Sequence, residues 1–343
     1  MPAGLIRIPM DDPADVPRDL DDVLPPGRAP GDVRAVVVKS EGNGCVNDFS
    51  RALAARAWHE RVTSAVTVVS GGTEGVLSPH ATLLFEDVPR SDARGDLVLG
   101  VGKTSRIAWS ELGSESHARD VGDAVRAIQK DLEVEPDDVA LVLVKCPLLT
   151  QDRIESVKAG GKKPRTEDPY ESMAASRAAS ALGVAHALGE LDDRQLRDGI
   201  AGDRDVWSTV ASASAGGELD TCNIVMLARK PGSGGALRAT NVVMGDALDA
   251  TGALEAISAI RGAGGTVRQI FAKADPDPTG AIRGHRHTML TDSDLHSTRH
   301  ARAAVGGLLA GLSADPMIYV SGGAENQGPP GGGPVVVVWE PVP

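Results

Sequence analysis

Three widely separated segments of the chain repeat one order of motifs. Each begins with an apolar run that ends in a lysine: "DVRAVVVKSEGNG", "DDVALVLVKCPLL" and "GTVRQIFAKADPDPTG". An alanine-rich segment follows, and then a serine junction: Ser70-Gly-Gly-Thr-Glu74, Ser214-Ala-Gly-Gly-Glu218 or Ser321-Gly-Gly-Ala-Glu325. Short apolar runs bounded by turn residues are typical of buried strands, and spacing that varies while order is kept places the insertions in loops. The order therefore predicts three copies of one α/β unit.

The boundaries of these units follow from the strand expected to close each one. "DLVLGVGK", "NIVMLARK" and "PVVVVWE" are the candidate closing strands. They place the units near residues 1–104, 112–249 and 255–343. If the units pack around a pseudo-threefold axis, corresponding residues meet at its centre.

Bulk properties narrow the class of protein. The chain has 343 residues, of which 41% are hydrophobic and 24% charged, as in soluble globular proteins. Its net charge of −12 argues against a nucleic-acid partner, since a basic face is the usual electrostatic footprint of such proteins. No apolar run approaches the roughly 20 residues of a membrane helix, and the N-terminus does not read as a secretory signal. We expect a cytoplasmic protein with no membrane partner.

An arginine recurs near the start of each alanine-rich helix that the pattern predicts. Arg51, Arg177 and Arg299 each follow a serine or threonine in "FSRALAARAWHERV", "MAASRAASALGVAHALGEL" and "HSTRHARAAVGGLLAGL". A hydroxyl at this position can cap backbone N–H groups, whereas the helix dipole disfavours an arginine there. An unfavourable choice repeated three times suggests that the arginines serve a ligand.

Three lysines, three arginines and three serines would then surround one pocket. The lysines are Lys39, Lys145 and Lys273, and the serines are Ser70, Ser214 and Ser321. Arginine donates two parallel hydrogen bonds to carbonyl or carboxylate oxygens, so the ligand should be small, planar and electron-rich or anionic. A lysine crowded by other cations and partly desolvated favours its neutral form and can deprotonate a serine. The residues point to attack on an amide or imide carbonyl of a small ring.

Two other functions use the same residues or their neighbours. A non-catalytic binder of small anions would use the same cationic pocket and would be separated from an enzyme by its lack of turnover. The segment "GHRHTMLTDSDLHSTRH" offers His285, His287, Asp292, Asp294, His296 and His300 as ligands for a metal-dependent cyclic amidohydrolase. That motif is absent from the other two repeats, so we rank it lower.

Several motifs resemble those of the cyanuric acid hydrolase/barbiturase family. They are "KSEGNGCVND", "SGGTEGVLSPH", "VKCPLLT", "YESMAASRAASALG", "SASAG", "RHTMLTDSDLHSTRHARA" and "SGGAENQGPPGGGP", and the resemblance covers nearly the whole chain. It implies three homologous α/β repeat units around a pseudo-threefold axis, with a central β-barrel, outer helices and a central active site. It also implies a homotetramer.

The resemblance assigns roles that the residues alone leave open among the three Ser–Lys pairs. Ser214 is the implied nucleophile and Lys145 its base. The implied substrate-binding residues are Lys39, Arg51, Ser70, Gly71, Arg177, Ala215, Lys273, Arg299, Ser321 and Gly322. Among them, Gly71, Ala215 and Gly322 would act through backbone N–H groups.

The resemblance further implies a structural divalent cation, Mg²⁺ or Ca²⁺, and no organic cofactor. Its ligands would be Asp275, Ala324, Gln327, Gly328, Pro329 and Gly332, mostly through backbone oxygens, as hard cations prefer. Asp275 stands where the family has a glutamate.

The intact threefold pattern favours one substrate within the family. Cyanuric acid has three equivalent carbonyls, whereas barbiturate replaces one ring nitrogen with carbon. Because this sequence keeps lysine, arginine and serine in all three units, we expect a cyanuric acid amidohydrolase. It would open the s-triazine ring to carboxybiuret, which loses CO2 to give biuret. A barbiturase remains the alternative.

Overall fold

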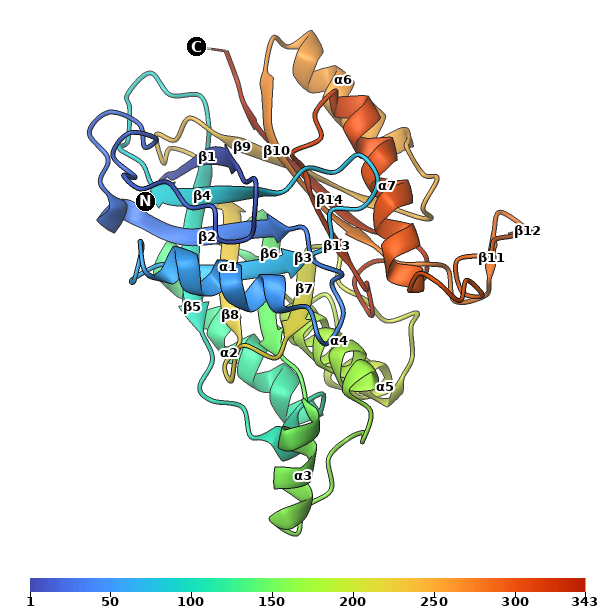
Figure 1. Ribbon diagram of the computed structural model, residues 1–343. Helices are drawn as coiled ribbons and strands as arrows, with labels where there is room; N and C mark the ends of the chain where they lie inside the picture. Colours follow the sequence, from blue (N-terminus) through green and yellow to red (C-terminus); the bar gives the residue numbers. More distant parts are fainter. Residues whose placement is uncertain (343) are drawn as a thin grey trace.

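The computed structural model describes residues 1–342 as a mixed α/β protein with three four-stranded sheets (Figure 1). The α/β class predicted from the sequence is confirmed. In spatial order, the first sheet holds β1 (Ala3–Pro9), β4 (His80–Glu86), β2 (Val33–Ser40) and β3 (Val66–Gly71). The second holds β5 (Leu97–Lys103), β8 (Asn223–Arg229), β6 (Val139–Pro147) and β7 (Ala211–Gly216). The third holds β9 (Arg238–Met244), β14 (Gly333–Glu340), β10 (Thr266–Ala274) and β13 (Tyr319–Gly322).

The three sheets share one connectivity. In each sheet, the lysine strand runs parallel to the serine strand. It runs antiparallel to the strand that comes after the serine strand in the sequence. The register pairs Lys39 with Ser70, Lys145 with Ser214 and Lys273 with Ser321. Each lysine strand also has a register shift near its start against its antiparallel neighbour. The pairing of the strands therefore sets each predicted lysine directly beside its serine.

Strand pairing places two strands, β5 and β9, in the sheets formed by the residues that follow them. The run "DLVLGVGK" is β5 and pairs with β8, so it opens the second sheet and does not close the first unit. Similarly, β9 pairs with β14 and belongs to the third sheet. The first sheet is completed by β4. The strands of the first, second and third sheets span residues 3–86, 97–229 and 238–340, and each sheet with the helices of its range is called a unit below. An apolar run reveals a strand, but its partner depends on contacts far along the chain.

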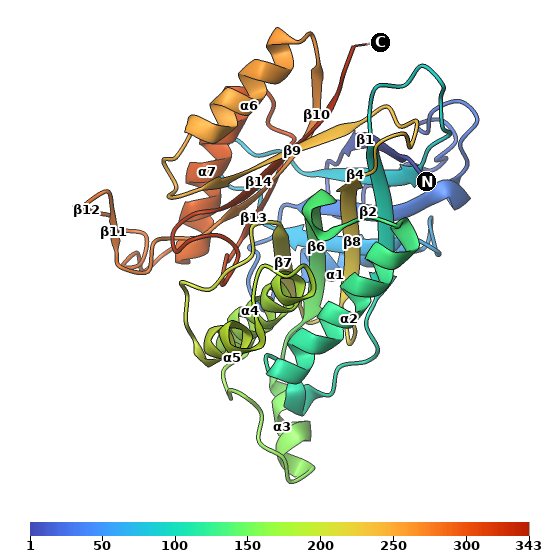
Figure 2. The ribbon, with the colours of Figure 1, turned by 180° about the vertical axis from the view of Figure 1, so that it is seen from behind.

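The part of the chain that the structure describes forms seven α-helices. They are α1 (Phe49–His59), α2 (Glu115–Leu132), α3 (Gln151–Ala159), α4 (Pro169–Ala187), α5 (Asp193–Ala201), α6 (Thr251–Gly262) and α7 (Ser297–Ser313). Of these, α3 and α5 pack on other helices and the rest on the sheets. Seen from behind, α2 and α4 cover the second sheet, while α6 and α7 lie side by side against the third (Figure 2). A small hairpin, β11 (Ala281–Ile282) and β12 (His285–Arg286), projects away from the third sheet (Figure 1). None of these helices is both long and apolar enough to cross a membrane.

Each sheet buries both faces. One face contributes to a shared central core that contains Val37, Leu143 and Phe271, one residue from each lysine strand. The other face packs under the helices of the same unit in separate clusters, for example around Trp58 of α1. Burying one such aliphatic or aromatic side chain contributes about 1.5–3 kcal/mol. Only isolated contacts link the sheets, such as the bridge between Pro2 and Val98, and none of the three sheets is closed into a barrel.

The caps of the alanine-rich helices differ from those predicted. Asp48 and Asp168 cap α1 and α4 through carboxylate oxygens that accept backbone N–H groups. His296 caps α7 through its ring nitrogen. The serine before Arg177 instead donates its hydroxyl hydrogen to Pro147 O. Because α4 begins at Pro169, Arg177 lies in its third turn and not its first.

Candidate active site

One partly open cavity is lined by residues of all three units. It contains about 250 Å³ of empty space, including its opening. Its lining consists of Gly44, Arg51, Ser70, Gly71, Lys145, Met173, Arg177, Ser214, Ala215, Arg302, Ser321 and Gly322. The structure thus brings together the three predicted serines, two of the predicted arginines and the residue after each serine. Lys39 and Lys273 are almost fully buried and reach this cavity through their serines.

Two of the three Ser–Lys pairs are hydrogen-bonded. Lys39 Nζ lies 3.3 Å from Ser70 Oγ, and Lys273 Nζ lies 3.2 Å from Ser321 Oγ. The two hydroxyls are also 3.4 Å from each other. These serines are therefore held within a network that joins the first and third units.

The pair in the second unit is arranged differently. Lys145 Nζ donates to Ala215 O at 3.2 Å and lies 3.2 Å from Glu218 Oε1. Ser214 Oγ is buried and has no hydrogen-bond partner, although Lys145 and Ser214 are register partners across β6 and β7. The implied nucleophile is thus the one serine of the three whose hydroxyl is uncommitted.

A backbone contact is common to all three lysines. Each donates to the carbonyl oxygen of the residue that follows its serine. The pairs are Lys39 to Gly71 at 3.0 Å, Lys145 to Ala215 at 3.2 Å and Lys273 to Gly322 at 3.3 Å. These contacts fix the ammonium groups beneath the serine turns.

Two cavity arginines each cross to the serine turn of another unit. Arg177 of the second unit binds Glu325 of the third, with contacts of 2.7 and 2.6 Å. Arg302 of the third unit binds Glu74 of the first, with contacts of 2.7 and 2.5 Å. Both arginines are nearly buried, so these charge-assisted bidentate pairs lie in a low-dielectric environment where they are strong.

Arg302 takes the place predicted for Arg299. Arg299 has a third of its side chain exposed, is absent from the cavity lining and contacts Glu74 from outside at 3.1 Å. The local sequence held a signal: Arg51, Arg177 and Arg302 are each followed by Ala-Leu or Ala-Ala, whereas Arg299 is followed by His-Ala. The hydroxyl before Arg299 predicts an arginine one turn before the one that lines the cavity. Met173, which also lines the cavity, carried no such signal.

Arg51 crosses to the second unit but binds no carboxylate. Its Nη1 donates to Ala215 O at 3.1 Å and its Nη2 donates to Cys45 O at 2.7 Å. Its Nε is buried without a partner. Glu218, which corresponds to Glu74 and Glu325, is instead close to Lys145.

The glycines of the serine turns explain this difference. Gly72 and Gly323 have positive φ angles of 97° and 77°, and a Cβ on either would lie 2.5 Å from the guanidinium of the arriving arginine. Gly216 occupies the corresponding position in the second unit and has no positive φ. A Cβ there would lie 2.1 Å from Glu218 Oε2. In the turns of the first and third units this space receives an arginine. In the turn of the second unit the same space is filled by the turn's own glutamate.

Burial lowers the pKa of all three lysines. For Lys39, burial and the charge of Arg302 hold the pKa well below its usual value. For Lys273, burial and the nearby Arg177 lower the pKa to about 7. Burial also lowers the pKa of Lys145, but the Glu218 carboxylate opposes that shift. These shifts favour the neutral amine that a general base requires.

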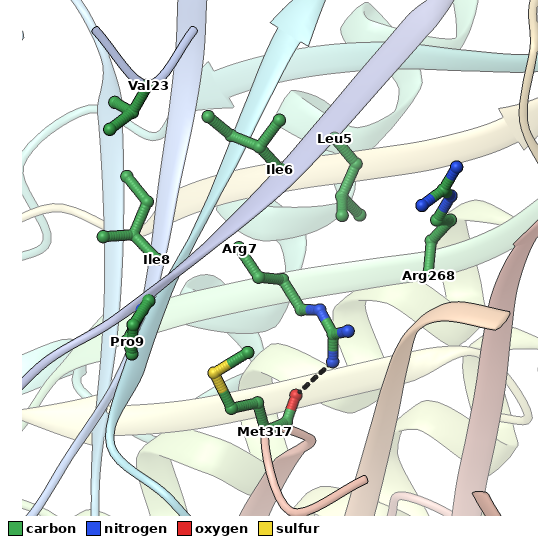
Figure 3. Close-up of a pocket in the computed structure, with 8 residues that line it drawn as sticks. All are labelled: Leu5, Ile6, Arg7, Ile8, Pro9, Val23, Arg268 and Met317. Carbon is green, nitrogen blue, oxygen red and sulfur yellow. Dashed lines mark hydrogen bonds between the residues drawn. The ribbon is translucent and has the colours of Figure 1, made fainter.

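A larger and more open hollow, with about 910 Å³ of empty space including its opening, lies elsewhere, against β1 (Figure 3). It is lined by Leu5, Ile6, Arg7, Ile8, Pro9, Val23, Arg268 and Met317. Arg7 points to Met317 O at 2.9 Å and pairs with Asp315, while Arg268 pairs with Glu340. Its charged groups are engaged and it holds no nucleophile, so it is a poor candidate for the chemistry.

The histidine-rich segment does not form a metal centre in the described residues. His300 binds Asp292 at 3.0 Å, His287 faces a backbone carbonyl and His285 is exposed on the hairpin. No three histidine, cysteine or acidic side chains of residues 1–342 lie close enough to hold an ion. The geometry that a metal-dependent amidohydrolase would need from these histidines is therefore missing.

The predicted cation ligands lie along one turn. Gly323 N–H donates to Ala274 O at 3.1 Å, which brings this turn against the segment that holds Asp275. Asp275 Oδ2 accepts from Arg204 at 3.0 Å, and burial together with the charge of Glu325 raises the pKa of Asp275 to about 6. Gln327 uses its side-chain amide within the protein, so only its backbone oxygen is available. One carboxylate and several backbone oxygens suit a hard cation, but Arg204 already contacts the carboxylate.

Comparisons with known proteins identify the family of this chain and its similar structures. A family described as amidohydrolase ring-opening proteins (Amido_AtzD_TrzD) matches residues 4–340. The cyanuric acid amidohydrolase of Pseudonocardia dioxanivorans is 55% identical over 91% of this chain and 91% of its own. That of Sarocladium sp. is 46% identical over 99% and 98%. The crystal structure of the hydrolase from A. caulinodans has a TM-score of 0.91 at 41% identity and covers 100% of both chains. A second structure, presented as cyanuric acid hydrolase arising by structural concatenation, has a TM-score of 0.91 at 39% identity, covering 98% of this chain and 99% of its own.

Proposed function

The chain belongs to the family of ring-opening amidohydrolases, and from that premise we propose that it hydrolyses cyanuric acid. It would be a hydrolase acting on a C–N bond of a cyclic amide. The observation that carries the proposal is the cavity that gathers three serines, a lysine and three arginines from three units. Named relatives at 46–55% identity over more than nine-tenths of the chain support the substrate.

The cavity groups suit a small cyclic imide. Guanidinium groups from three units supply donors for carbonyl oxygens at the rim of a planar ring. The serine turns place small residues, Gly71, Ala215 and Gly322, against the ligand, where their N–H groups would stabilise a developing oxyanion. The substrate-binding roles of Lys39, Lys273, Ser70 and Ser321 are part of the same proposal.

Ser214 and Lys145 would carry the reaction. Neutral Lys145 takes the proton of Ser214 Oγ as that oxygen attacks one ring carbonyl. The tetrahedral intermediate collapses by breaking the ring C–N bond, and the ring nitrogen receives the proton. Water then attacks the resulting ester, releases carboxybiuret and restores the serine hydroxyl. Carboxybiuret loses CO2 to give biuret.

The three units would be copies of one fold around a pseudo-threefold axis. Their common connectivity and the shared central core support this arrangement. The arginines support it further because they cross in cyclic order: first unit to second, second to third and third to first. The predicted central barrel would then be an assembly of three facing sheets.

Two further expectations stay part of the proposal. A divalent cation, Mg²⁺ or Ca²⁺, would be held by Asp275 and by backbone oxygens of Ala324, Gln327, Gly328, Pro329 and Gly332, and would stabilise the last turn. The backbone-oxygen character of the turn supports the cation, while Arg204 would compete with it for Asp275. A homotetramer is the proposed assembly, and light scattering coupled to gel filtration tests it.

A side-by-side assay of cyanuric acid and barbiturate tests the function. Barbiturate has a CH2 edge that cannot donate the hydrogen bond of a ring N–H, so it leaves a buried acceptor unpaired at about 1–3 kcal/mol. We expect kcat/KM for cyanuric acid to exceed that for barbiturate by about ten- to a hundredfold. Equal values, or a preference for barbiturate, would make the chain a barbiturase. Binding of either ring without release of product would make it an anion-binding protein.

A further inference from the structure

Glu218 stands out among the three glutamates of the serine turns. Glu74 and Glu325 are each held in a bidentate pair by an arginine of another unit. Glu218 has no such arginine, because Arg51 donates its hydrogen bonds to backbone carbonyls. Its Oε1 instead lies 3.2 Å from Lys145 Nζ.

This contact falls on the base of the proposed reaction. The glutamate and the lysine ammonium are both largely buried, with side-chain exposures of 12% and 2%. When Lys145 takes the serine proton, a positive charge appears in a site that water does not solvate. A carboxylate already in place stabilises that charge without reorganisation, which is how fixed groups lower a barrier.

We propose that Glu218 is a positioning residue that orients Lys145 and stabilises its protonated form during attack by Ser214. The inference rests on the proposed function and deepens it. It also gives a structural reason why one Ser–Lys pair of three performs the chemistry: only Lys145 has a carboxylate partner, and only Ser214 has an uncommitted hydroxyl.

The groups around this pair determine how it titrates. Arg51 and Cys146 lie near Lys145. The charge of Glu218 also acts on the guanidinium of Arg153 and raises its pKa against the effect of burial. The carboxylate raises the pKa of Lys145 against the effects of burial and Arg51. Removing the carboxylate should therefore lower that pKa, while the other neighbours stay unchanged.

The variant Glu218→Gln keeps the shape of the side chain and removes its charge. We expect kcat at its pH plateau to fall about ten- to a hundredfold. The ascending limb of kcat/KM against pH, which reports the neutral base, should move to lower pH. Ionisation of the substrate affects wild type and variant equally, so it cancels in this comparison. A residue with only a structural role would lower activity without moving the limb.

Glu74→Gln is the matched control, because Glu74 holds the same place in the first unit but pairs with Arg302. It should raise KM and leave the limb in place. Glu218→Asp should recover part of the lost kcat. An unmoved limb in Glu218→Gln, or an equal shift in Glu74→Gln, would overturn the inference.

A measurement without turnover separates this inference from the proposed function. Lys145→Met, Glu218→Gln and the double variant form a thermal-stability cycle. We expect the fall in Tm of the double variant to be smaller than the sum of the single falls, since either change alone leaves one buried charge unpaired. Additive falls would overturn the pairing of Glu218 with Lys145. A coupled cycle with no hydrolysis of cyanuric acid by the wild type would instead overturn the proposed function.

Discussion

The serine turns of the second and third units share a sequence pattern but hold different partners. In the third unit, Glu325 binds an arginine and Ser321 binds its lysine. In the second, Glu218 Oε1 lies 3.2 Å from Lys145 Nζ as a charge contact, and Ser214 Oγ has no hydrogen-bond partner. The first unit behaves as the third does. The second turn thus differs from the other two in the partner of its glutamate, and under the proposed function this difference would separate a turn that binds from a turn that attacks.

The difference suggests how a cavity lined by three similar units can carry out a reaction at only one of its three Ser–Lys pairs. Under the proposed function, a planar ring with three equal edges would meet similar donors from all three units. Chemistry requires one hydroxyl to be free and one amine to exchange a proton. In the first and third units the hydroxyl is engaged by an ammonium group, whereas in the second the ammonium group is drawn toward a carboxylate.

Removal of the second pair should have the largest effect. Ser214→Ala and Lys145→Ala should each lower kcat by about three orders of magnitude or more, and the double variant should be little worse, because residues that act together are not additive. Ser70→Ala and Ser321→Ala each remove one hydrogen bond and should lower kcat/KM about tenfold. Steady-state release of biuret measures all four. A comparable loss in Ser70→Ala or Ser321→Ala would show that the turns are not functionally different.

The loss of stability on substitution should be larger for the arginines that reach the first and third serine turns than for the arginine that reaches the second. Arg177→Gln and Arg302→Gln each leave a largely buried glutamate unpaired and should lower the unfolding free energy by about 3–5 kcal/mol. Arg51→Gln loses only hydrogen bonds to backbone carbonyls and should lower it by about 1 kcal/mol. Urea unfolding monitored by circular dichroism gives the values. Equal losses for all three would mean that Arg51 also pairs with a carboxylate in solution.

Acid should lower the free energy of unfolding through a buried histidine of the second unit. His117 is fully buried, and burial lowers its pKa to about 4, so the folded state holds it neutral. Its contribution to stability is complete above pH 6.5 and is lost as pH falls toward 4, because only the unfolded chain takes up the proton in that window. Between pH 7 and 5 the loss should be about 2 kcal/mol from this residue.

A second buried histidine provides the control for that measurement. His80 of the first unit has a pKa lowered to about 4 by burial and should contribute a similar loss. His117→Gln should therefore flatten the pH dependence of unfolding by about half, as His80→Gln should. If His117→Gln retains the full wild-type dependence, acid sensitivity does not reside in the second unit.

The cation should have the smallest effect. In the wild type, Arg204 contacts Asp275, so added Mg²⁺ should stabilise the fold by only about 1 kcal/mol or less. Arg204→Gln frees the carboxylate and should show a larger Mg²⁺-dependent rise in Tm. Thermal shift with and without EDTA measures both. A chelated sample that keeps its Tm and loses all activity would point to a catalytic metal and contradict a structural role.

The sequence by itself determined the three lysine strands, the serine junctions and the Ser–Lys pairs. Apolar runs and small-residue turns are local signals, and they recur three times. The order of motifs also predicted that residues far apart in the chain would meet, as Ser70, Ser214 and Ser321 do in one cavity. Family resemblance added the implied role of Ser214, which the repeated pattern left open.

Only the tertiary structure decided which strands and which charges pair. It assigned β5 and β9 to the sheets that follow them, because an apolar run does not encode its partner. It chose Arg302 over Arg299, since two arginines three residues apart in one helix differ in the depth to which they reach. It placed Glu218 beside Lys145, while Arg51 donates to backbone carbonyls. Ion-pair partners in a buried site depend on a few ångströms of backbone placement, and three turns of one sequence pattern do not specify that distance.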